Sequence, residues 1–572
     1  MRYTIAFLLF SLSAVAQPQI NSNYGVTSAA SPFIGLAPGC IFFVNGVNLG
    51  AANDNPMSLF QNATYPLPTS AGLNGTTIQF VPIGGQGPAV ANQGAVNGIM
   101  LYESPTLLAA ILPSSTQVAD YNVTVTYNGQ TSAPSPLLRV APRNFGLFTY
   151  AQLQGGPGLG YGPGALLELN SSNTYVYGNL GNTATPGGTV VLMGTGLGAT
   201  QGNDSQGPAT SGIVGLSPVD FQVYIGGQLA TFAVGQDYIG RFIFSNGPVF
   251  AGIDIIQVQV PKNVQGCAVP VTVILDGVAS NFTTMSIDPS GSYCSEPVIG
   301  YTLSDFQQIH ADQMARVGTV GIVGSVLNGY APDGTPITTR TDSVTTSFVN
   351  LTAAQLDSTA GYPSVGGCSV IPVSLSEAPS PQALSGAPLD AGATLNLNGP
   401  NGYQPIAQAL NALTYPAISS STPLVDAGSY SIDNGGGGAD VGSFQGLLNV
   451  PAPPQIVSAG VNGVINTTQN LSVQWSGADP NSEILIFGAS IDLNTSYSVV
   501  FECTAPSTAT QFTVPSYVLS SLPTTSTSVG VFSLQNIGQQ SFQAPGLEAG
   551  HFTYQIGPSV QVQFTRGAPV KQ

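Results

Sequence analysis

The sequence predicts an all-β protein, built from a row of β-sandwich domains with few and short helices. Charged residues make up only 6% of the 572 residues, against about 25% in ordinary soluble domains, whereas exposed helix faces normally draw on Glu, Lys and Arg. Short alternating strands bounded by turn residues recur at intervals of about 10 residues, which is typical of sandwiches. The chain also repeats itself, with one stretch returning 148 residues later.

The repeat has three anchors at this single offset. The matched pairs are PGCIFFVNGVNLG at 38–50 with PGGTVVLMGTGLG at 186–198, Leu112-Pro113 with Val260-Pro261, and Asn128-Gly129 with Asp276-Gly277. A fixed period predicts two copies of one module of about 120 residues. The first two domains are therefore expected at 17–143 and 144–290.

Glycines mark the predicted turns of both copies. Asn-Gly and Asp-Gly between alternating runs are hairpin signals, because Gly accepts the positive φ that such turns require. Pro-Gly before the first strand and Gly-x-x-Leu-Gly after it bracket a short buried strand. The glycines assigned to turns on this basis are Gly46, Gly50, Gly129, Gly194, Gly198 and Gly277.

The two copies resemble IPT/TIG immunoglobulin-like domains. APGCIFFVNGVNLG and TPGGTVVLMGTGLG, with their later P…NG and P…DG hairpins, carry the resemblance, which covers about 24–289. More closely, they are similar to the repeated module of large uncharacterised secreted proteins of acidobacteria (Solibacter-type). The resemblance implies an immunoglobulin-like sandwich and export, and it brings no known activity and no catalytic residue. Cys40 departs from the small polar residue that is usual at its position.

The second half of the chain predicts two further β-rich domains, 291–450 and 455–572, joined by a stiff Pro-rich linker at 451–454. LDAGAT at 389–394 returns as VDAGSY at 425–430, which predicts two similarly placed strands. In the last domain, Leu471, Val473 and Trp475 alternate with polar residues, so Trp475 is expected on an inward face. This strand weakly resembles the Trp-bearing strand of fibronectin type III modules.

Two helices are expected in the third domain. Ser304 to Gln307 fits a capping box, with Ile309 on the face of Phe306, which predicts a helix over 304–315. The apolar spacing of PIAQALNAL predicts another over 405–413.

The first sixteen residues predict a signal peptide. Arg2 precedes the apolar run IAFLLFSL at 5–12, and Ala14-Val15-Ala16 has small residues where signal peptidase cleaves. The run is shorter than the roughly 20 apolar residues of a membrane span. We therefore expect a secreted or outer-surface protein without a membrane span.

Five cysteines in an exported chain indicate disulfides rather than a metal site. Cys267 precedes one strand and Cys294 follows the next, so they flank a hairpin and are expected to pair. Cys368 and Cys503 are the second candidate pair, between the last two domains. Cys40 begins a buried strand and is expected to be a free core thiol.

Motifs for chemistry are weak. GTGLGA at 194–199 matches the dinucleotide-binding fingerprint, but the following TQGNDSQGPATSG cannot form the helix that this motif needs, so a tight turn is expected. His310 and His551 are the only histidines; without a Gly-x-Ser-x-Gly elbow or a zinc motif, both are expected to be exposed or to cap a helix. Asp433 and Asp440 flank a Gly-rich tract that is a calcium candidate, although a mobile loop is favoured. No other cofactor is expected.

The net charge of −17 would repel a phosphate backbone, which excludes nucleic acids as partners. The expected function is a non-catalytic scaffold for extracellular interaction or adhesion, which displays loops such as 51–75 and 199–216 to an unidentified extracellular protein or glycan. The first alternative is a carbohydrate-binding accessory protein, with some of the 22 Tyr as stacking surfaces. The second is a glycoside hydrolase that uses two convergent carboxylates.

Overall fold

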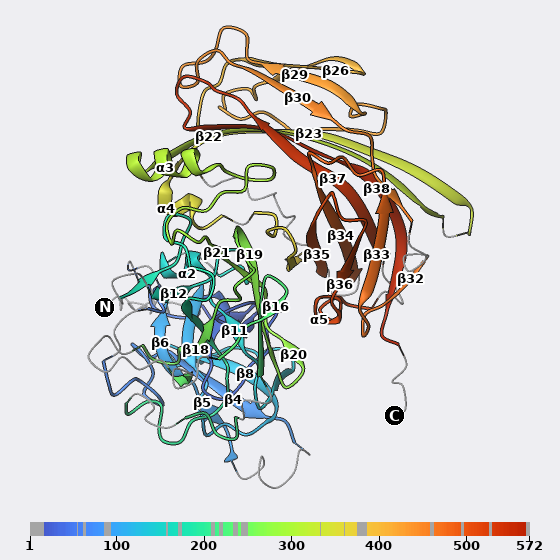
Figure 1. The fold of residues 1–572 in the computed structure, drawn as a ribbon. Coiled ribbons are helices and arrows are strands. Elements are labelled where there is room, and N and C mark those ends of the chain that lie inside the picture. Colours follow the sequence, from blue (N-terminus) through green and yellow to red (C-terminus); the bar gives the residue numbers. More distant parts are fainter. Residues whose placement is uncertain are drawn as a thin grey trace, which may run out of the picture. The chain divides into compact units, whose positions relative to one another are not determined.

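The computed structural model describes residues 16–567 except 54, 56, 61–63, 85–92, 156–157, 170–173, 208–211, 217–220, 233–237, 242–249, 332, 360, 375–385, 458–462, 493–496 and 525–528. The predicted signal peptide lies, apart from Ala16, outside the described residues. The regular structure of the described chain is mostly antiparallel β-sheet, with four short helices among the described residues, which confirms the all-β prediction (Figure 1). Among the described residues, no helix has the length and apolar character of a membrane span.

The chain divides into two compact units. The first comprises Met1–Phe145, Thr195–Gly215 and Gly240–Asp254, and the second comprises Gly146–Gly194, Leu216–Ile239 and Ile255–Gln572.

The first unit contains the first sandwich. One sheet has the order β1-β3-β7-β6 with β2 on β3, and the other has the order β10-β8-β4-β5 with β9 on β8. The strands are β1 (Gln19–Ile20), β2 (Val26–Ser28), β3 (Ile41–Val47), β4 (Thr77–Pro82), β5 (Val96–Asn97), β6 (Ile99–Glu103), β7 (Leu107–Ile111), β8 (Ala119–Tyr127), β9 (Gln130–Thr131) and β10 (Leu138–Val140). Alternate residues of β8 are buried, and the rings of Phe42, Phe80 and Tyr121 meet edge to face between the sheets.

The second copy of the module repeats this construction. Its sheets have the orders β13-β12-β14-β18-β17, with β11 on β14, and β16-β15-β19-β20, with β21 on β19. The elements are β11 (Gly146–Leu147), α2 (Tyr150–Leu153), β12 (Leu166–Leu169), β13 (Tyr175–Tyr177), β14 (Thr189–Thr195), β15 (Phe221–Ile225), β16 (Gln228–Leu229), β17 (Ile239–Arg241), β18 (Asp254–Gln259), β19 (Gly266–Leu275), β20 (Val278–Ala279) and β21 (Thr283–Ile287).

The six glycines assigned to turns fall into three groups. Gly129 (φ 75°) and Gly277 (φ 77°) occupy the tight turns of the β8–β9 and β19–β20 hairpins, and Gly198 also has a positive φ. Gly46 and Gly194 instead lie inside β3 and β14, so the turn assignment is wrong for them. At Gly46 the reason is close packing, because a Cβ there would lie 2.0 Å from the carbonyl oxygen of Gln19 on β1. Gly50 follows β3 without a positive φ, and a Cβ there would lie 3.0 Å from Glu103 Oε2.

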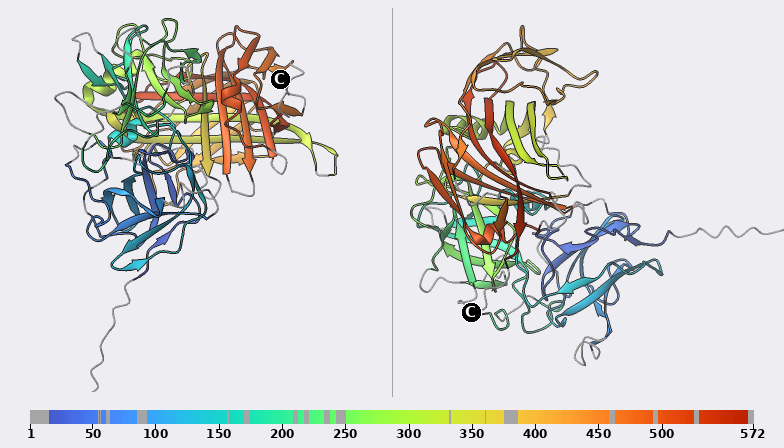
Figure 2. Two further views of the ribbon diagram at one scale, coloured as in Figure 1. Left: turned by 90° about the horizontal axis from the view of Figure 1, so that it is seen from below. Right: turned by 90° about the vertical axis from the view of Figure 1, so that its right-hand side faces the viewer.

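The C-terminal half of the second unit is one domain around a ten-stranded sheet, ordered β24-β35-β34-β37-β38-β22-β23-β25 with β28 on β23 and β32 on β38. Its strands are β22 (Met314–Tyr330), β23 (Pro336–Thr352), β24 (Cys368–Ser374), β25 (Ala387–Pro388), β28 (Ile418–Ser420), β32 (Val464–Asn466), β34 (Glu483–Asp492), β35 (Tyr497–Pro506), β37 (Val529–Ser541) and β38 (Ala549–Thr565). In Figure 2 the long β22–β23 hairpin runs beside the red strand β38.

The predicted boundary between 291–450 and 455–572 is therefore wrong. β22 pairs in parallel with β38 from Val317 opposite Ala549 to Asn328 opposite Val560, and β24 pairs with β35 across the same boundary. Alternation along a strand specifies which face is buried but not which strand lies beside it. The sequence therefore gave no sign that strands on the two sides of the Pro-rich linker pair with each other, and the linker was interpreted as a domain boundary.

Two smaller sheets pack against successive parts of this sheet. The first has the order β27-β26-β29-β30, and the second has the order β31-β33-β36. Their strands are β26 (Thr394–Gly399), β27 (Gly402–Ala407), β29 (Gly428–Asp433), β30 (Gln445–Val450), β31 (Gln455–Ile456), β33 (Leu471–Ser476) and β36 (Gln511–Val514). Phe552 and Ile556 of β38 enter the first core, and Phe564 enters the second, where Trp475 is 3% exposed. The inward position of Trp475 is confirmed, and the two DAG strands are the neighbours β26 and β29.

The two helix predictions fare differently. The helix α3 (Leu303–Asp312) forms, but its capping box is Thr302 with Asp305 rather than Ser304 with Gln307. The helix expected over 405–413 is wrong, because its first residues belong to β27, which pairs along β26. The sheet supplies hydrogen bonds and a buried side for Ile406, which override a helical apolar pattern. The remaining helices are α4 (Ala353–Leu356) and α5 (Ser516–Leu519).

Candidate ligand-binding cavity

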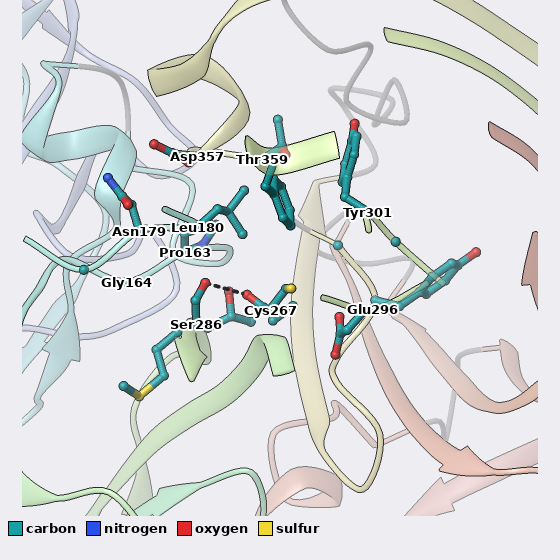
Figure 3. A pocket seen from close by; sticks show the side chains of 18 of the residues that line it. Pro163, Gly164, Asn179, Leu180, Cys267, Ser286, Glu296, Tyr301, Asp357 and Thr359 are labelled. Carbon is teal, nitrogen blue, oxygen red and sulfur yellow. Dashed lines mark hydrogen bonds between the residues drawn. The ribbon is translucent and has the colours of Figure 1, made fainter. Parts of the chain in front are cut away.

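A cavity of about 200 Å³ lies within the second unit, between the second sandwich, the segment 296–306 and residues 357–362 (Figure 3). Its wall mixes apolar and hydrogen-bonding side chains, and no Lys or Arg is among the described residues that form it. The lining side chains used below are Leu166, Asn179, Leu180, Cys267, Ser286, Glu296, Ile299, Tyr301, Phe306, Asp357, Thr359 and Tyr362.

A disulfide and several hydrogen bonds fix the wall. Cys267 of β19 is bonded to Cys294, with a Cα–Cα distance of 5.3 Å, and the Ser286 hydroxyl donates to the Cys267 carbonyl oxygen at 2.9 Å (Figure 3). The segment after Cys294 turns back on itself, since the Glu296 N–H donates to the Tyr301 carbonyl at 2.9 Å. Gln539 of β37 donates its amide N–H to the Gly300 carbonyl. The cavity is therefore preformed by the fold.

The other predicted cysteines also lie as the sequence suggested. Cys368 and Cys503 face each other on β24 and β35 and are disulfide-bonded, with a Cα–Cα distance of 4.0 Å. Cys40 is a free thiol that is 1% exposed in the first sandwich.

Glu296 forms one side of the cavity. Burial raises the pKa of its carboxyl to about 7, although hydrogen bonds from the Ser364 hydroxyl and the Cys267 N–H favour the charged form. The nearby carboxylate of Glu483 raises it further. A second cavity of about 600 Å³ shares Glu296 and Ile299 with the first and is also lined by Asp288 and Glu483. Glu296 therefore separates two spaces that are rich in acceptors.

Asp357 forms the opposite side in the view of Figure 3. It directly follows α4, is 3% exposed, and its Oδ1 has no hydrogen-bond partner in the described structure. His310 Nε2 lies 3.5 Å from that oxygen. Asn179 accepts the Gly181 N–H at 3.0 Å, and its side chain is hydrogen-bonded to Tyr150.

Glu168 lies behind this wall. Its side chain on β12 is buried, and burial raises its pKa to about 9, so the carboxyl is neutral at pH 7. Gly178, which lines the cavity, leaves room for it, because a Cβ at Gly178 would lie 2.3 Å from Glu168 Oε1.

Neither histidine is exposed; His310 lies in the last turn of α3, close to the helix-capping alternative that the sequence suggested, whereas His551 lies inside a strand. His551 on β38 is 4% exposed, with the ring of Tyr301 edge-on at 4.9 Å, and burial lowers its pKa. The side chain of His310 in the last turn of α3 is 14% exposed and packs against Tyr293. Both histidines lie where α3 and the segment before it cover the large sheet. This contact joins distant parts of the chain, so no local sequence pattern predicts it.

The two calcium-ligand candidates, Asp433 and Asp440, accept hydrogen bonds from different groups. Asp433 Oδ1 accepts from the Asn396 amide at 2.7 Å and from the Gly435 N–H at 3.0 Å, whereas Asp440 Oδ2 accepts the Asp390 N–H at 2.8 Å. Asn434, between them, is 4% exposed and hydrogen-bonded on both sides of its amide. The tract is thus anchored at Asn434, whereas Gly435, Gly436, Ala439 and Asp440 are exposed. No group of three or more His, Cys, Asp or Glu within the described ranges could hold a metal ion.

The GTGLGA segment belongs to the first unit from Thr195 onward. Its described continuation forms no helix, and Thr200 instead bridges to Ile213. Asp254 accepts the Leu197 N–H at 2.8 Å and pairs with Arg241, which also donates to the Gly198 carbonyl at 3.1 Å. The glycine turn therefore encloses a buried ion pair.

The loop 199–216 packs against the first module instead of being held free. Asp204 Oδ2 accepts the Ser114 N–H at 2.7 Å, and the Ser205 carbonyl accepts the Leu67 N–H at 2.8 Å. The expectation of a displayed loop is wrong at these positions, because the polar groups of the loop are used within the first unit.

Burial of the acids predicts a pH dependence of stability. Glu296 and Glu502, with pKa values raised by burial to about 7 from an ordinary value of 4.5, stay protonated in the folded state where the unfolded chain has released the proton. The free energy of unfolding should therefore fall as the pH rises from 4.5 to about 7. We expect Tm to drop by on the order of 5 °C between pH 5 and pH 8. Glu296→Gln should flatten this dependence in a differential scanning calorimetry series, and an unchanged slope would contradict the assignment.

Comparisons with known proteins give no family. No family model matches the chain, and no curated protein matches it. Similar solved structures include a Bacteroides ovatus protein, SGBP-B of a mixed-linkage glucan utilization locus in complex with a mixed-linkage heptasaccharide, at 11% identity over 78% of this chain and 79% of that chain, with a TM-score of 0.12.

Two further solved structures are about as weakly similar to this chain. SGBP-B from a complex xyloglucan utilization locus of Bacteroides uniformis is 9% identical over 94% of this chain and 97% of that chain, with a TM-score of 0.15. The FN1–FN3 domains of chicken CNTN1 are 9% identical over 68% of this chain and 96% of that chain, with a TM-score of 0.14. Because these TM-scores are far below 0.5, the functional proposal rests on the chain's own residues.

Proposed function

We propose that this protein is an exported, non-catalytic β-sandwich scaffold for extracellular recognition or adhesion. Two disulfides suit an oxidising compartment. The observation that carries the proposal is the preformed cavity of the second unit, whose wall is held by the Cys267–Cys294 bridge. Fixed walls reduce the ordering cost of binding. Cell fractionation tests the export: we expect the protein outside the cytoplasm, and a cytoplasmic location would contradict the proposal.

Carbohydrate is the second candidate, favoured by the composition of the same wall. Tyr301, Tyr362 and Phe306 supply aromatic surface, and Asn179 and Thr359 supply hydrogen-bonding groups. Concave sites with a few placed polar groups on apolar walls bind small polar molecules. Aromatic rings next to hydrogen-bonding groups suit the mixed faces of a sugar ring.

Binding is preferred over glycoside hydrolysis because of the size of the cavity. A hydrolase would need two carboxyl groups that converge on one cleft, and Glu296 and Asp357 both belong to the lining of this cavity. Hydrolysis, however, needs room for the sugars on both sides of the scissile bond and for water. A cavity of about 200 Å³ is smaller than the roughly 300–1,000 Å³ of common ligand pockets, so it suits a ligand of about one sugar ring.

A glycan array with the mature chain tests the carbohydrate candidate. We expect saturable binding to one class of neutral glycan and weak retention on heparin, because the net charge is −17. Absence of binding to every glycan would overturn the carbohydrate candidate, and strong heparin retention would contradict the expected charge selectivity.

A further inference from the structure

The expected cleavage by signal peptidase leaves a reactive residue at the start of the mature chain. Small residues at Ala14-Val15-Ala16 place the cut before Gln17. An N-terminal glutamine carries a nucleophile, its α-amine, and an electrophile, the carbon of its side-chain amide, within one residue. Attack of one on the other closes an unstrained five-membered ring, and reactions within one molecule are favoured by the fixed proximity of the two groups.

The structure leaves Gln17 accessible and holds the residues that follow it. Gln17 is exposed, whereas Pro18 is buried and Gln19 begins β1, where it pairs with Val47 of β3. The side-chain amide of Gln17 donates to the carbonyl oxygen of Thr131 at an exposed position, where water can replace this hydrogen bond. A first residue that is free to react therefore precedes a strand that is already fixed in the first sandwich.

We propose that Gln17 of the exported chain cyclises to pyroglutamate. The nitrogen of the α-amine forms a bond to Cδ, the bond between Cδ and Nε2 breaks, and Nε2 leaves as ammonia with a proton taken from the amine. The step involves no oxidation and no co-reactant. Since α-amino groups have ordinary pKa values of about 7.7–8.0, the unprotonated amine is present at neutral pH. The inference rests on the export proposed above and adds a modification site.

The lactam protects the start of β1. Exopeptidases that attack the N-terminus recognise a free α-amine, which pyroglutamate lacks. Removal of Gln17 and Pro18 would take away the buried proline and leave Gln19 of β1 as the chain end. Chain ends that are not tied down are where disorder and proteolysis concentrate.

Mass spectrometry of the full chain tests the proposal. The chain is expressed with its first sixteen residues in a bacterium that exports proteins and is purified from outside the cytoplasm. Chymotrypsin, which cleaves after aromatic residues, releases peptide 17–24 from the denatured protein. We expect this peptide to be lighter than its sequence by one ammonia, with the loss located at Gln17. Gln19 is the internal control, because its nitrogen lies in a peptide bond, and it should keep its full mass.

Gln17→Asn is the matched variant. It keeps the amide but is one methylene shorter, so the corresponding ring would have four members and does not form. We expect an open N-terminus in this variant, from which an X-Pro dipeptidyl peptidase removes the first two residues, whereas the wild-type chain resists the enzyme. Equal trimming of both chains would overturn the protective role. Circular dichroism establishes that both fold.

A chain released at Gln17 from a cleavable N-terminal fusion keeps the inference testable if the variant is not exported. It is incubated at neutral pH beside the free peptide QPQINSNY. We expect both to lose ammonia, and a folded chain that stays open after the peptide has cyclised would overturn the inference. The outcomes in the exporting cell separate the two proposals. An exported chain that begins with an open Gln17, or at another residue, overturns the pyroglutamate alone, whereas a cytoplasmic chain that retains residues 1–16 overturns the export as well.

Discussion

A chain that ends at Gly546, and so lacks β38, is expected not to fold anywhere from α3 onward. β38 pairs with β37 on one side and with β22 on the other, and its Phe552 and Phe564 lie in two different cores. Loss of β38 exposes the edges of both neighbouring strands and opens both hydrophobic cores. The resulting loss of free energy exceeds the total free energy of unfolding of a typical domain. Near-UV circular dichroism and amide hydrogen exchange should show loss of structure across 303–541.

A cut at the linker 451–454 sharpens the same prediction. We expect a fragment of residues 17–450 to be unfolded beyond the second sandwich when expressed alone, and to regain protection in β22 and β23 when 455–572 is co-expressed. As a single-site version, Phe552→Ala should cost about 3–5 kcal/mol, whereas Gln563→Ala, on an exposed position of the same strand, should be nearly neutral. Native-like protection of 291–450 on its own would contradict the single ten-stranded sheet.

Arg241→Met is expected to destabilise the first unit by about 3–5 kcal/mol, because it leaves a buried carboxylate without its partner. Asp254 is fully buried and Arg241 is 5% exposed. Burial raises the pKa of Asp254 to about 6 even with the guanidinium beside it. Without Arg241 this pKa should rise further, so the loss should be larger at pH 7 than at pH 5.

Urea denaturation at both pH values measures this effect. Arg139→Met is the control, because its ion pair with Asp120 is exposed and should contribute less than about 1 kcal/mol. The double variant Arg241→Met with Asp254→Leu should recover part of the loss, since it removes both charges. A loss below 1 kcal/mol, or one independent of pH, would contradict the structural role of the ion pair.

Local features of the fold were predictable from the sequence. The β8–β9 and β19–β20 hairpins follow from Asn128-Gly129 and Asp276-Gly277, whose left-handed backbone is a local property. The burial of Trp475 follows from alternation within one strand. The Cys267–Cys294 bridge follows from two strands that are consecutive in the chain.

Long-range pairing was not predictable. β22 and β38 are separated by more than two hundred residues, and neither strand has a sequence pattern that identifies the other as its pairing partner. The helix expected over 405–413 failed for a related reason, since only the presence of β26 makes a strand the better structure there.

The residues that line the cavity could not be predicted either, because they too come together only through long-range packing. Glu296 and Asp357 come from irregular segments and have no motif, so their approach to one cavity depends on the packing of three separate stretches. Glu168 could have been identified from the sequence. An acid within the apolar run LLEL of a buried strand indicates a carboxyl group that is either functional or protonated.

Incubation of the full chain with neutral polysaccharides, followed by mass spectrometry of both the protein and the glycan, tests the non-catalytic binding role most directly. We expect saturable capture of one neutral glycan class, competition by the matching free sugar, and recovery of the glycan at its original length. Shortened products, or no capture of any neutral glycan, would contradict it.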